Sequence, residues 1–178
     1  MKKIVAFGAS NSSKSINQQL AKWASSQLSD CEINLVDLND YEMPIYSMDR
    51  EQASGIPEKT QQFKEALRVA DGIIISFAEH NGSYSAAFKN IFDWMSRIDK
   101  PIWMDKKMFL MATSPGGRGG AGVLAAASGA FPHQGGQVAA TFSLPSFNQH
   151  FKAAEGITDA ELKGAFEEQL VNFRNAID

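Results

Sequence analysis

Five short apolar runs alternate with segments of helical periodicity along this chain, and the alternation constrains the fold more than any other feature. The runs lie at residues 4–7, 33–38, 72–77, 108–112 and 138–142. The run at 72–77 is continuous and rich in isoleucine, which is typical of a strand covered on both faces. A strand–helix order repeated five times predicts a three-layer α/β fold, with one parallel sheet between two layers of helices.

The segments between the runs repeat apolar residues at the spacing of one helix face. Predicted helices span about residues 17–28, 57–70, 88–95 and 123–131. A last helix is predicted to begin at the capping-box pattern Thr158-Asp159-Ala160-Glu161. Residues 41–55 contain turn formers and show no periodicity, so we expect a surface excursion there.

Length and charge exclude several classes of protein. The 178 residues fit a single domain over 1–178, and a net charge of −3 without a basic run argues against a nucleic-acid partner. The single Cys31 excludes an internal disulfide and a cysteine-based metal site. No stretch approaches the ~18 apolar residues of a membrane helix, and the N-terminal apolar part is too short for a signal peptide. We therefore expect a cytoplasmic protein without a membrane partner.

The segment Gly8–Asn17 connects the first run to the first predicted helix. It holds four serines, two asparagines and one lysine, and it has no acidic residue. Hydroxyls, amides and the unpaired N–H groups of a helix N-terminus are all donors, and the helix dipole favours an anion there. This composition indicates a phosphate site. The alternative is a polar turn in which Ser or Asn caps the helix.

Five parallel strands favour the order 2-1-3-4-5, which puts a ligand crevice at the carboxyl ends of strands one and three. Loops that follow strands one, three and four converge at that edge. The loop at 78–84 contains His80, Asn81 and a glycine that lets backbone approach a planar ligand. The alternative is a capping loop with His80 in solvent. His80 has no second His or Cys nearby, which argues against a metal site.

The loop at 114–122 is rich in glycine. Gly117, Gly119 and Gly122 match the spacing of a dinucleotide fingerprint, Gly-x-Gly-x-x-Gly. The match falls in the fourth strand–helix loop rather than the first, and no Asp or Glu for a ribose occurs near 138–141. We therefore interpret it as a chance match. The backbone N–H groups of such a loop can still pack against a planar ring.

Three motifs resemble those of the NADPH-dependent FMN reductase family, whose fold is flavodoxin-like. For the family's Gly-Ser-x-Arg-x-x-Ser-x-Asn, this chain has Ala9-Ser10-Asn11-Ser12-Ser13-Lys14-Ser15-Ile16-Asn17. For Pro-Glu-Tyr-Asn-Gly/His-Ser before a Leu-Lys-Asn-x-Ile-Asp-Trp helix, it has Ala78-Glu79-His80-Asn81-Gly82-Ser83 and Phe88-Lys89-Asn90-Ile91-Phe92-Asp93-Trp94. For Ser-x-Gly-x-x-Gly-Gly, it has Ser114-Pro115-Gly116-Gly117-Arg118-Gly119-Gly120. The resemblance spans about residues 1–142.

The resemblance implies an FMN-dependent oxidoreductase that passes hydride from NADPH or NADH to a small acceptor such as a quinone, flavin or azo compound. The chemistry occurs at flavin N5, so no catalytic side chain and no metal ligand are implied. The implied phosphate ligands are Ser10, Ser12, Ser15, Ile16 and Asn17. The implied ring contacts are Glu79, His80, Asn81 and Gly82 on the dimethylbenzene side, and Ser114, Gly116 and Gly117 on the pyrimidine side.

The resemblance also implies a homodimer or homotetramer with the flavin near the subunit interface. The expected contact is the helix that carries Phe88, Phe92 and Trp94, and the alternative is that these aromatics belong to the core. An electron carrier without its own substrate is the alternative function, and such carriers are strongly acidic. A member that has lost the flavin and acts only as a scaffold is a third possibility.

Three positions depart from the family pattern. Ser12 replaces the arginine, which removes a fixed charge from the phosphate site and leaves Lys14 as a point charge nearby. His80 replaces the tyrosine, so a smaller and titratable ring would face the flavin. Ala78 replaces the proline, which loosens the loop. The sequence does not choose between NADH and NADPH.

Overall fold

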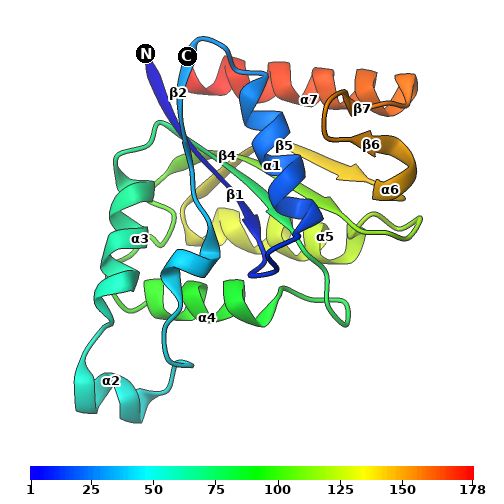
Figure 1. Ribbon diagram of the computed structural model, residues 1–178. Helices are drawn as coiled ribbons and strands as arrows, with labels where there is room; N and C mark the ends of the chain where they lie inside the picture. The colour runs from blue at the N-terminus through cyan, green and yellow to red at the C-terminus, as the bar shows by residue number, and fades with distance from the viewer.

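The computed structural model describes residues Met1–Asp178 and contains a five-stranded parallel sheet in the order β2-β1-β3-β4-β5, which confirms the predicted order (Figure 1). The strands are β1 (Lys2–Ala9), β2 (Cys31–Leu35), β3 (Gly72–Phe77), β4 (Lys106–Thr113) and β5 (Gly136–Leu144). In the strand register, Ala9 of β1 pairs with Phe77 of β3, and Phe77 pairs with Ala112 of β4. These three strands therefore end at the same level. The chain reverses its winding direction between β1 and β3, at the middle of the sheet.

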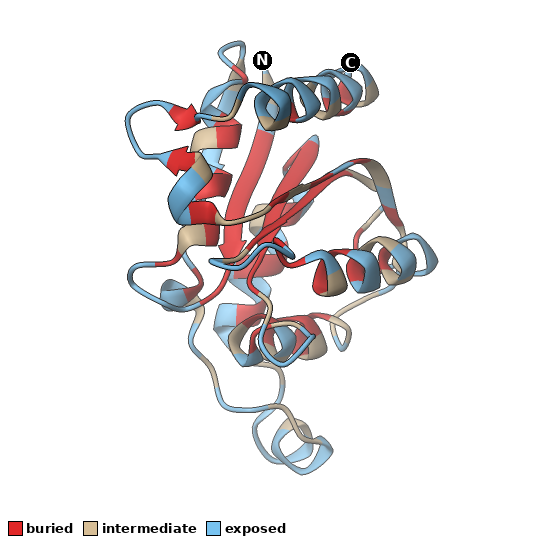
Figure 2. Cartoon of the chain, turned by 90° about the vertical axis from the view of Figure 1, so that its right-hand side faces the viewer, coloured by how far each residue is buried: buried red, intermediate tan, exposed pale blue.

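Helices cover both faces of the sheet, as expected. One face is covered by α1 (Ile16–Ser26) and α7 (Ala160–Ile177), and the other by α3 (Glu58–Arg68), α4 (Ala86–Met95) and α5 (Ala121–Ala130) (Figure 1). Successive residues of the central strands alternate between two separate apolar cores, because side chains of a strand point to opposite faces. The central strands β1, β3 and β4 are buried along most of their length and the edge strands β2 and β5 are not, whereas the helices bury only the side that faces the sheet (Figure 2).

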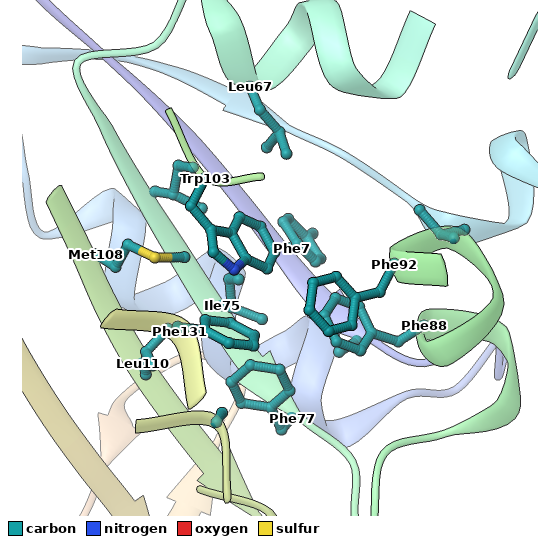
Figure 3. Packing of buried hydrophobic residues seen from close by; sticks show 14 of the residues in the cluster. Phe7, Leu67, Ile75, Phe77, Phe88, Phe92, Trp103, Met108, Leu110 and Phe131 are labelled. Atoms are coloured by element: carbon teal, nitrogen blue, oxygen red, sulfur yellow. The ribbon is translucent and has the colours of Figure 1, made fainter. Parts of the chain in front are cut away.

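The larger core, on the α3–α4–α5 face, is dominated by aromatic rings. Trp103 and Phe131 lie 4.5 Å apart between ring centroids, and Phe88 and Phe92 stack at 5.8 Å (Figure 3). Trp94 is also buried, and its Nε1 donates to the Pro44 carbonyl at 2.8 Å. The three side chains therefore follow the alternative that these aromatics belong to the core, and a subunit contact through α4 stays a prediction.

Two of the element boundaries that differ from the sequence predictions have a clear local cause. The second strand ends at Leu35, and the 3₁₀ helix η1 (Leu38–Tyr41) follows because Asp37 accepts a hydrogen bond from the Asn39 N–H at 2.9 Å. The N-cap of α7 is Asp159 rather than Thr158, since its Oδ1 accepts from the Leu162 N–H at 2.9 Å. In both places a hydrogen bond from a nearby backbone N–H to an aspartate side chain sets the boundary, in place of the residue that the sequence pattern indicates.

The surface excursion at 41–55 contains a helix that periodicity does not reveal, α2 (Met48–Ser54). No residue of α2 is buried, so it has no apolar stripe to produce a sequence signal. Figure 1 shows this helix standing away from the body of the protein on two connecting segments. The incoming segment is fixed to α4, where Asn90 Oδ1 accepts from the Tyr46 N–H at 2.8 Å. We call residues 42–54 the arm.

The last part of the chain adds small elements outside the predicted pattern. They are the 3₁₀ helix η2 (Phe131–Gln134), the short helix α6 (Phe147–His150) and the hairpin strands β6 (Phe151–Lys152) and β7 (Gly156–Ile157). Gly156 packs directly on the Trp23 ring of α1, where an ideal Cβ would lie 2.0 Å from ring atoms. None of the helices combines the length and the apolar character that crossing a membrane requires.

Candidate functional site

The loops that follow β1, β3 and β4 enclose a cleft of about 280 Å³ at the carboxyl edge of the sheet. It is lined by Ser10, Ser12, Lys14, Ser15, Ile16, Asn17, Ala78, Glu79, His80, Thr113, Ser114 and Pro115. The predicted convergence of these three loops is confirmed. The cleft lies at the point where the winding of the sheet reverses, which is the usual ligand crevice of open α/β sheets.

The start of α1 presents unpaired donors to this cleft. Ser15 is the N-cap, and its Oγ accepts from the Gln18 N–H at 3.1 Å. The backbone N–H groups of Ile16 and Asn17 have no acceptor within the protein. The helix dipole adds partial positive charge at this end, and Lys14 adds a full one. An anion bound here would satisfy donors that the fold leaves free.

Serine hydroxyls extend the set of free donors along the first loop. Ser10 Oγ accepts from the Ser12 N–H at 3.1 Å, and Ser12 Oγ accepts from the Lys14 N–H at 3.4 Å. Neither hydroxyl donates to a protein acceptor, and the same holds for Ser15. Each oxygen is thus fixed by an N–H while its proton stays available to a ligand.

Gly8 allows α1 to begin directly above the end of β1. An ideal Cβ at this position would lie 2.3 Å from the backbone nitrogen of Gln18, so any side chain would push the helix away. The Gly8 N–H donates to Gln18 Oε1 at 2.6 Å, and Gln18 Nε2 donates to the Val36 carbonyl at 2.9 Å. This close packing fixes the donor end of α1 relative to the strands.

Asn17 is 2% exposed, and its side chain makes three hydrogen bonds within the protein. Its Nδ2 donates to the Thr113 carbonyl at 3.2 Å, while its Oδ1 accepts from Ser76 Oγ at 2.8 Å and from the Thr113 N–H at 3.1 Å. The amide therefore joins α1 to the ends of β3 and β4. The backbone N–H of Asn17 stays free for a ligand.

The second loop contains a two-residue hairpin turn. The His80 N–H donates to the Ser83 carbonyl at 2.9 Å, and the Ser83 N–H donates back at 3.1 Å. Asn81 and Gly82 have φ of 52° and 76°, as a type I′ turn requires. Both are exposed and outside the cleft lining, so turn geometry explains these residue types. His80 is exposed and lines the cleft.

The third loop is held by the segment after β5. The Ser146 N–H donates to the Gly116 carbonyl at 2.9 Å, and the Phe147 N–H donates to the Ser114 carbonyl at 3.0 Å. An ideal Cβ at Gly119 would lie 2.5 Å from Ser143 Oγ, so glycine is required for packing. This contact, rather than nucleotide binding, explains part of the Gly-x-Gly-x-x-Gly spacing. Gly116 and Gly117 are exposed and lie outside the cleft lining. Ser114 is half-buried and lines the cleft.

His80 also lines a second cavity of about 480 Å³. Its walls come from the first loop, the segment from η1 to the arm, and the beginning of α4. They are Asn11, Leu38, Asn39, Tyr41, Glu42, Met43, Ile45, His80, Ser85, Ala86, Ala87, Asn90 and Ile91. His80 thus lines both cavities, which sequence reasoning did not foresee. The lining is about half apolar, with amides and one carboxylate between the apolar groups.

Sequence reasoning also missed residues that position the site without lining it. Ser76 and Gln18 are such residues, and so is Ser85, whose Oγ donates to the Ala9 carbonyl at 2.8 Å while it caps α4. Their partners are distant in sequence, 76 residues away for Ser85. The only sequence signal is their polar character at the ends of buried strands or at helix caps.

Fold and cleft together define a doubly wound α/β protein with an anion-binding helix start at its switch point. The sequence model of the family described as NADPH-dependent FMN reductase matches residues 2–149, so the chain belongs to that family. Among curated relatives, a quinone reductase of Escherichia coli K12 is 36% identical over 81 residues, which cover 45% of this chain and 43% of the relative. A 2-hydroxy-1,4-benzoquinone reductase of Burkholderia is 36% identical over 107 residues, covering 59% and 56%.

The match to these relatives thus spans about half of their length. Among solved structures, the NAD(P)H:acceptor oxidoreductase FerB of Paracoccus denitrificans superposes with a TM-score of 0.79 at 23% identity, covering 99% of this chain and 97% of FerB. An azoreductase of Bacillus anthracis gives 0.68 at 17% identity, covering 98% and 100%. At these identities the structural matches show the shared fold.

Proposed function

We propose that this protein is an FMN-dependent NAD(P)H oxidoreductase that reduces a small acceptor such as a quinone, a flavin or an azo compound. The observation that carries the proposal is the set of free donors at the start of α1. Two backbone N–H groups and three serine hydroxyls face the same cleft and have no protein acceptor. Family membership and the names of the relatives support the same class of reaction.

The residues present fit FMN. A terminal phosphate carries about −1.5 to −2 charges at pH 7, which suits a helix start with Lys14 beside it. The one acidic residue in the lining, Glu79, is hydrogen-bonded to the Val123 N–H at the start of α5. When bound, FMN supplies the hydride chemistry. The protein's own groups would hold the phosphate through Ser10, Ser12 and Ser15, and the second and third loops would hold the ring.

The cavity beyond His80 suits a small acceptor. Its volume of about 480 Å³ is in the range of small-molecule sites, and its mixed lining fits a planar ring with polar substituents. Quinones have this shape and polarity. The two curated relatives are named as quinone reductases, which agrees with that class.

Anaerobic mixing of the FMN-loaded protein with NADH or NADPH tests the proposal. We expect direct loss of the flavin absorbance with at least one nicotinamide, and its return when a quinone is added. An electron carrier would keep its colour until a partner reductase is added. The net charge of −3 argues against the carrier, because carriers dock through strongly acidic surfaces. A cytoplasmic location stays a prediction.

We further propose that two copies associate through the arm. Ile45 is 73% exposed and Met48 is 65% exposed, although hydrogen bonds to Asn90 and Trp94 hold this segment firmly. Rigid exposed apolar side chains are typical of contact surfaces. Light scattering of the Ile45→Lys, Met48→Lys double variant tests this: we expect a dimer to become a monomer, and an unchanged dimer would exclude the arm. Val171→Lys, an exposed site on α7, is the control.

A further inference from the structure

One carboxylate in the cleft wall has its partner in a different loop. Glu79 Oε1 accepts a hydrogen bond from the Val123 N–H at 2.9 Å, although 44 residues separate the two. Val123 is the third residue of α5, so Glu79 does at this helix what an N-cap side chain normally does. This is the only hydrogen bond between residues 78–84 and residues 114–124.

The beginning of α5 explains why its cap comes from so far away. Its own N-cap residue is Gly120, with φ 72°, and an ideal Cβ there would lie 2.9 Å from Ala112 Cβ. Close packing on β4 therefore excludes a capping side chain at that position. Gly122 leaves room for the substitute, because an ideal Cβ at 122 would lie 2.3 Å from Glu79 Oε1. The carboxylate occupies the space that a side chain at 122 would take.

We propose that Glu79 is a positioning residue whose carboxylate joins the second loop to α5 and thereby fixes the width of the cleft. A carboxylate at a helix N-terminus is favoured by the dipole and makes a strong, charge-assisted bond. The two loops are otherwise tied to different neighbours: the second to β1 through Ser85, and the third to the segment after β5. Without the bond between them, each loop can move separately, and a ligand held between them loses its preorganised site.

That FMN is the ligand rests on the proposed function, whereas the joint between the loops does not. Two variants break the joint from opposite sides. Glu79→Ala removes the carboxylate, and Gly122→Ala displaces it while keeping the charge. Two controls leave it intact. Glu79→Gln keeps an acceptor oxygen, and Gly129→Ala makes the same glycine change in the same helix, where an ideal Cβ meets no atom within 4 Å.

The first measurement is amide hydrogen exchange of the FMN-free protein. We expect Glu79→Ala and Gly122→Ala each to speed exchange of the Val123 N–H about tenfold or more, because its acceptor is lost. Glu79→Gln and Gly129→Ala should stay within a few-fold of the unchanged protein. Equal protection in Gly122→Ala and Gly129→Ala would overturn the proposal, whether or not the protein binds FMN.

The second measurement is calorimetric titration of each variant with FMN. We expect about tenfold weaker binding for Glu79→Ala and for Gly122→Ala, equal to the loss of one charge-assisted bond. Because both changes break one joint, the double variant should bind no worse than the weaker single variant. Effects that multiply would show two independent losses and contradict the proposal. Failure of the unchanged protein to bind FMN would instead contradict the proposed function.

Discussion

Ser15 has two roles that a single substitution can separate. Its Oγ caps α1 through the Gln18 N–H, and its hydroxyl proton is free toward the cleft. Ser15→Asp keeps the cap, since aspartate caps helices as well as serine does, but places a negative charge beside the proposed phosphate. We expect FMN affinity to fall about 100-fold or more. The free energy of unfolding should stay within about 0.5 kcal/mol of that of the unchanged protein.

Circular dichroism of the FMN-free protein and bound-flavin absorbance measure these two effects separately. Ser15→Ala is the matched control, because it removes the cap and costs about 1 kcal/mol of stability without adding a charge. Retention of flavin by Ser15→Asp would mean that Ser15 serves only as a helix cap.

His80 lines both cavities. We expect it to tune the rate of turnover rather than to act as an acid catalyst in flavin reduction. Hydride transfer from a nicotinamide needs no protein proton donor, so His80→Ala should keep measurable flavin reduction. His80→Tyr should bind FMN at least as well, because the larger ring offers more contact area. Stopped-flow reduction by NAD(P)H isolates this step. A loss beyond about 10³-fold in His80→Ala, with FMN bound, would instead indicate an acid–base catalyst.

At the scale of secondary-structure elements, Asn17 joins one helix to two strands. Replacing it with alanine leaves the Thr113 N–H, the Thr113 carbonyl and the Ser76 hydroxyl without their partner in a buried place. We expect Asn17→Ala to lower the free energy of unfolding by about 3 kcal/mol. Urea unfolding measures this, with Asn172→Ala on the exposed side of α7 as the control. A similar small effect in both variants would show that the amide does not hold the elements together.

An ion pair between the buried Lys64 and the half-buried Asp99 joins α3 to the segment after α4. Lys64 is 1% exposed and lies 2.7 Å from Asp99, which also pairs with Arg68 at 2.7 Å. The adjacent Lys64 ammonium and then the Arg68 guanidinium lower the pKa of Asp99 below its usual 3.8. A lowered carboxyl pKa contributes stability that is present above the unfolded pKa and is lost as pH falls through the folded pKa.

Asp99→Asn should therefore be less stable than the unchanged protein at pH 7, and the difference should shrink below about pH 4. Denaturant unfolding from pH 7 to pH 3 measures this difference. Asp105→Asn is the matched control, since Asp105 is exposed and makes no ion pair. A difference that stays constant over the whole range would contradict the assignment of the acid dependence to Asp99.

At the scale of the whole molecule, local sequence patterns predict the sheet order, both helix layers and the convergence of three loops. They succeed because buried strands such as 72–77 and amphipathic helices such as α4 carry their own periodicity. They miss α2, which buries nothing, and they do not reveal the hydrogen bonds that the side chains of Asn17 and Glu79 make within the protein. The hydrogen-bond partners of those two side chains lie 96 and 44 residues away, a relation that no local pattern contains.

The central claim is that the first loop binds a terminal phosphate. Calorimetric titration of the FMN-free protein with FMN and, separately, with FAD tests it most directly. In FAD that phosphate is joined to an adenylate through a pyrophosphate linkage, so it has lower charge and cannot fit the free donors at Ile16 and Asn17 in the same way. We predict saturable binding of FMN and at least tenfold weaker binding of FAD, a difference of about 1.4 kcal/mol or more. Equal affinities for the two flavins would contradict the phosphate site.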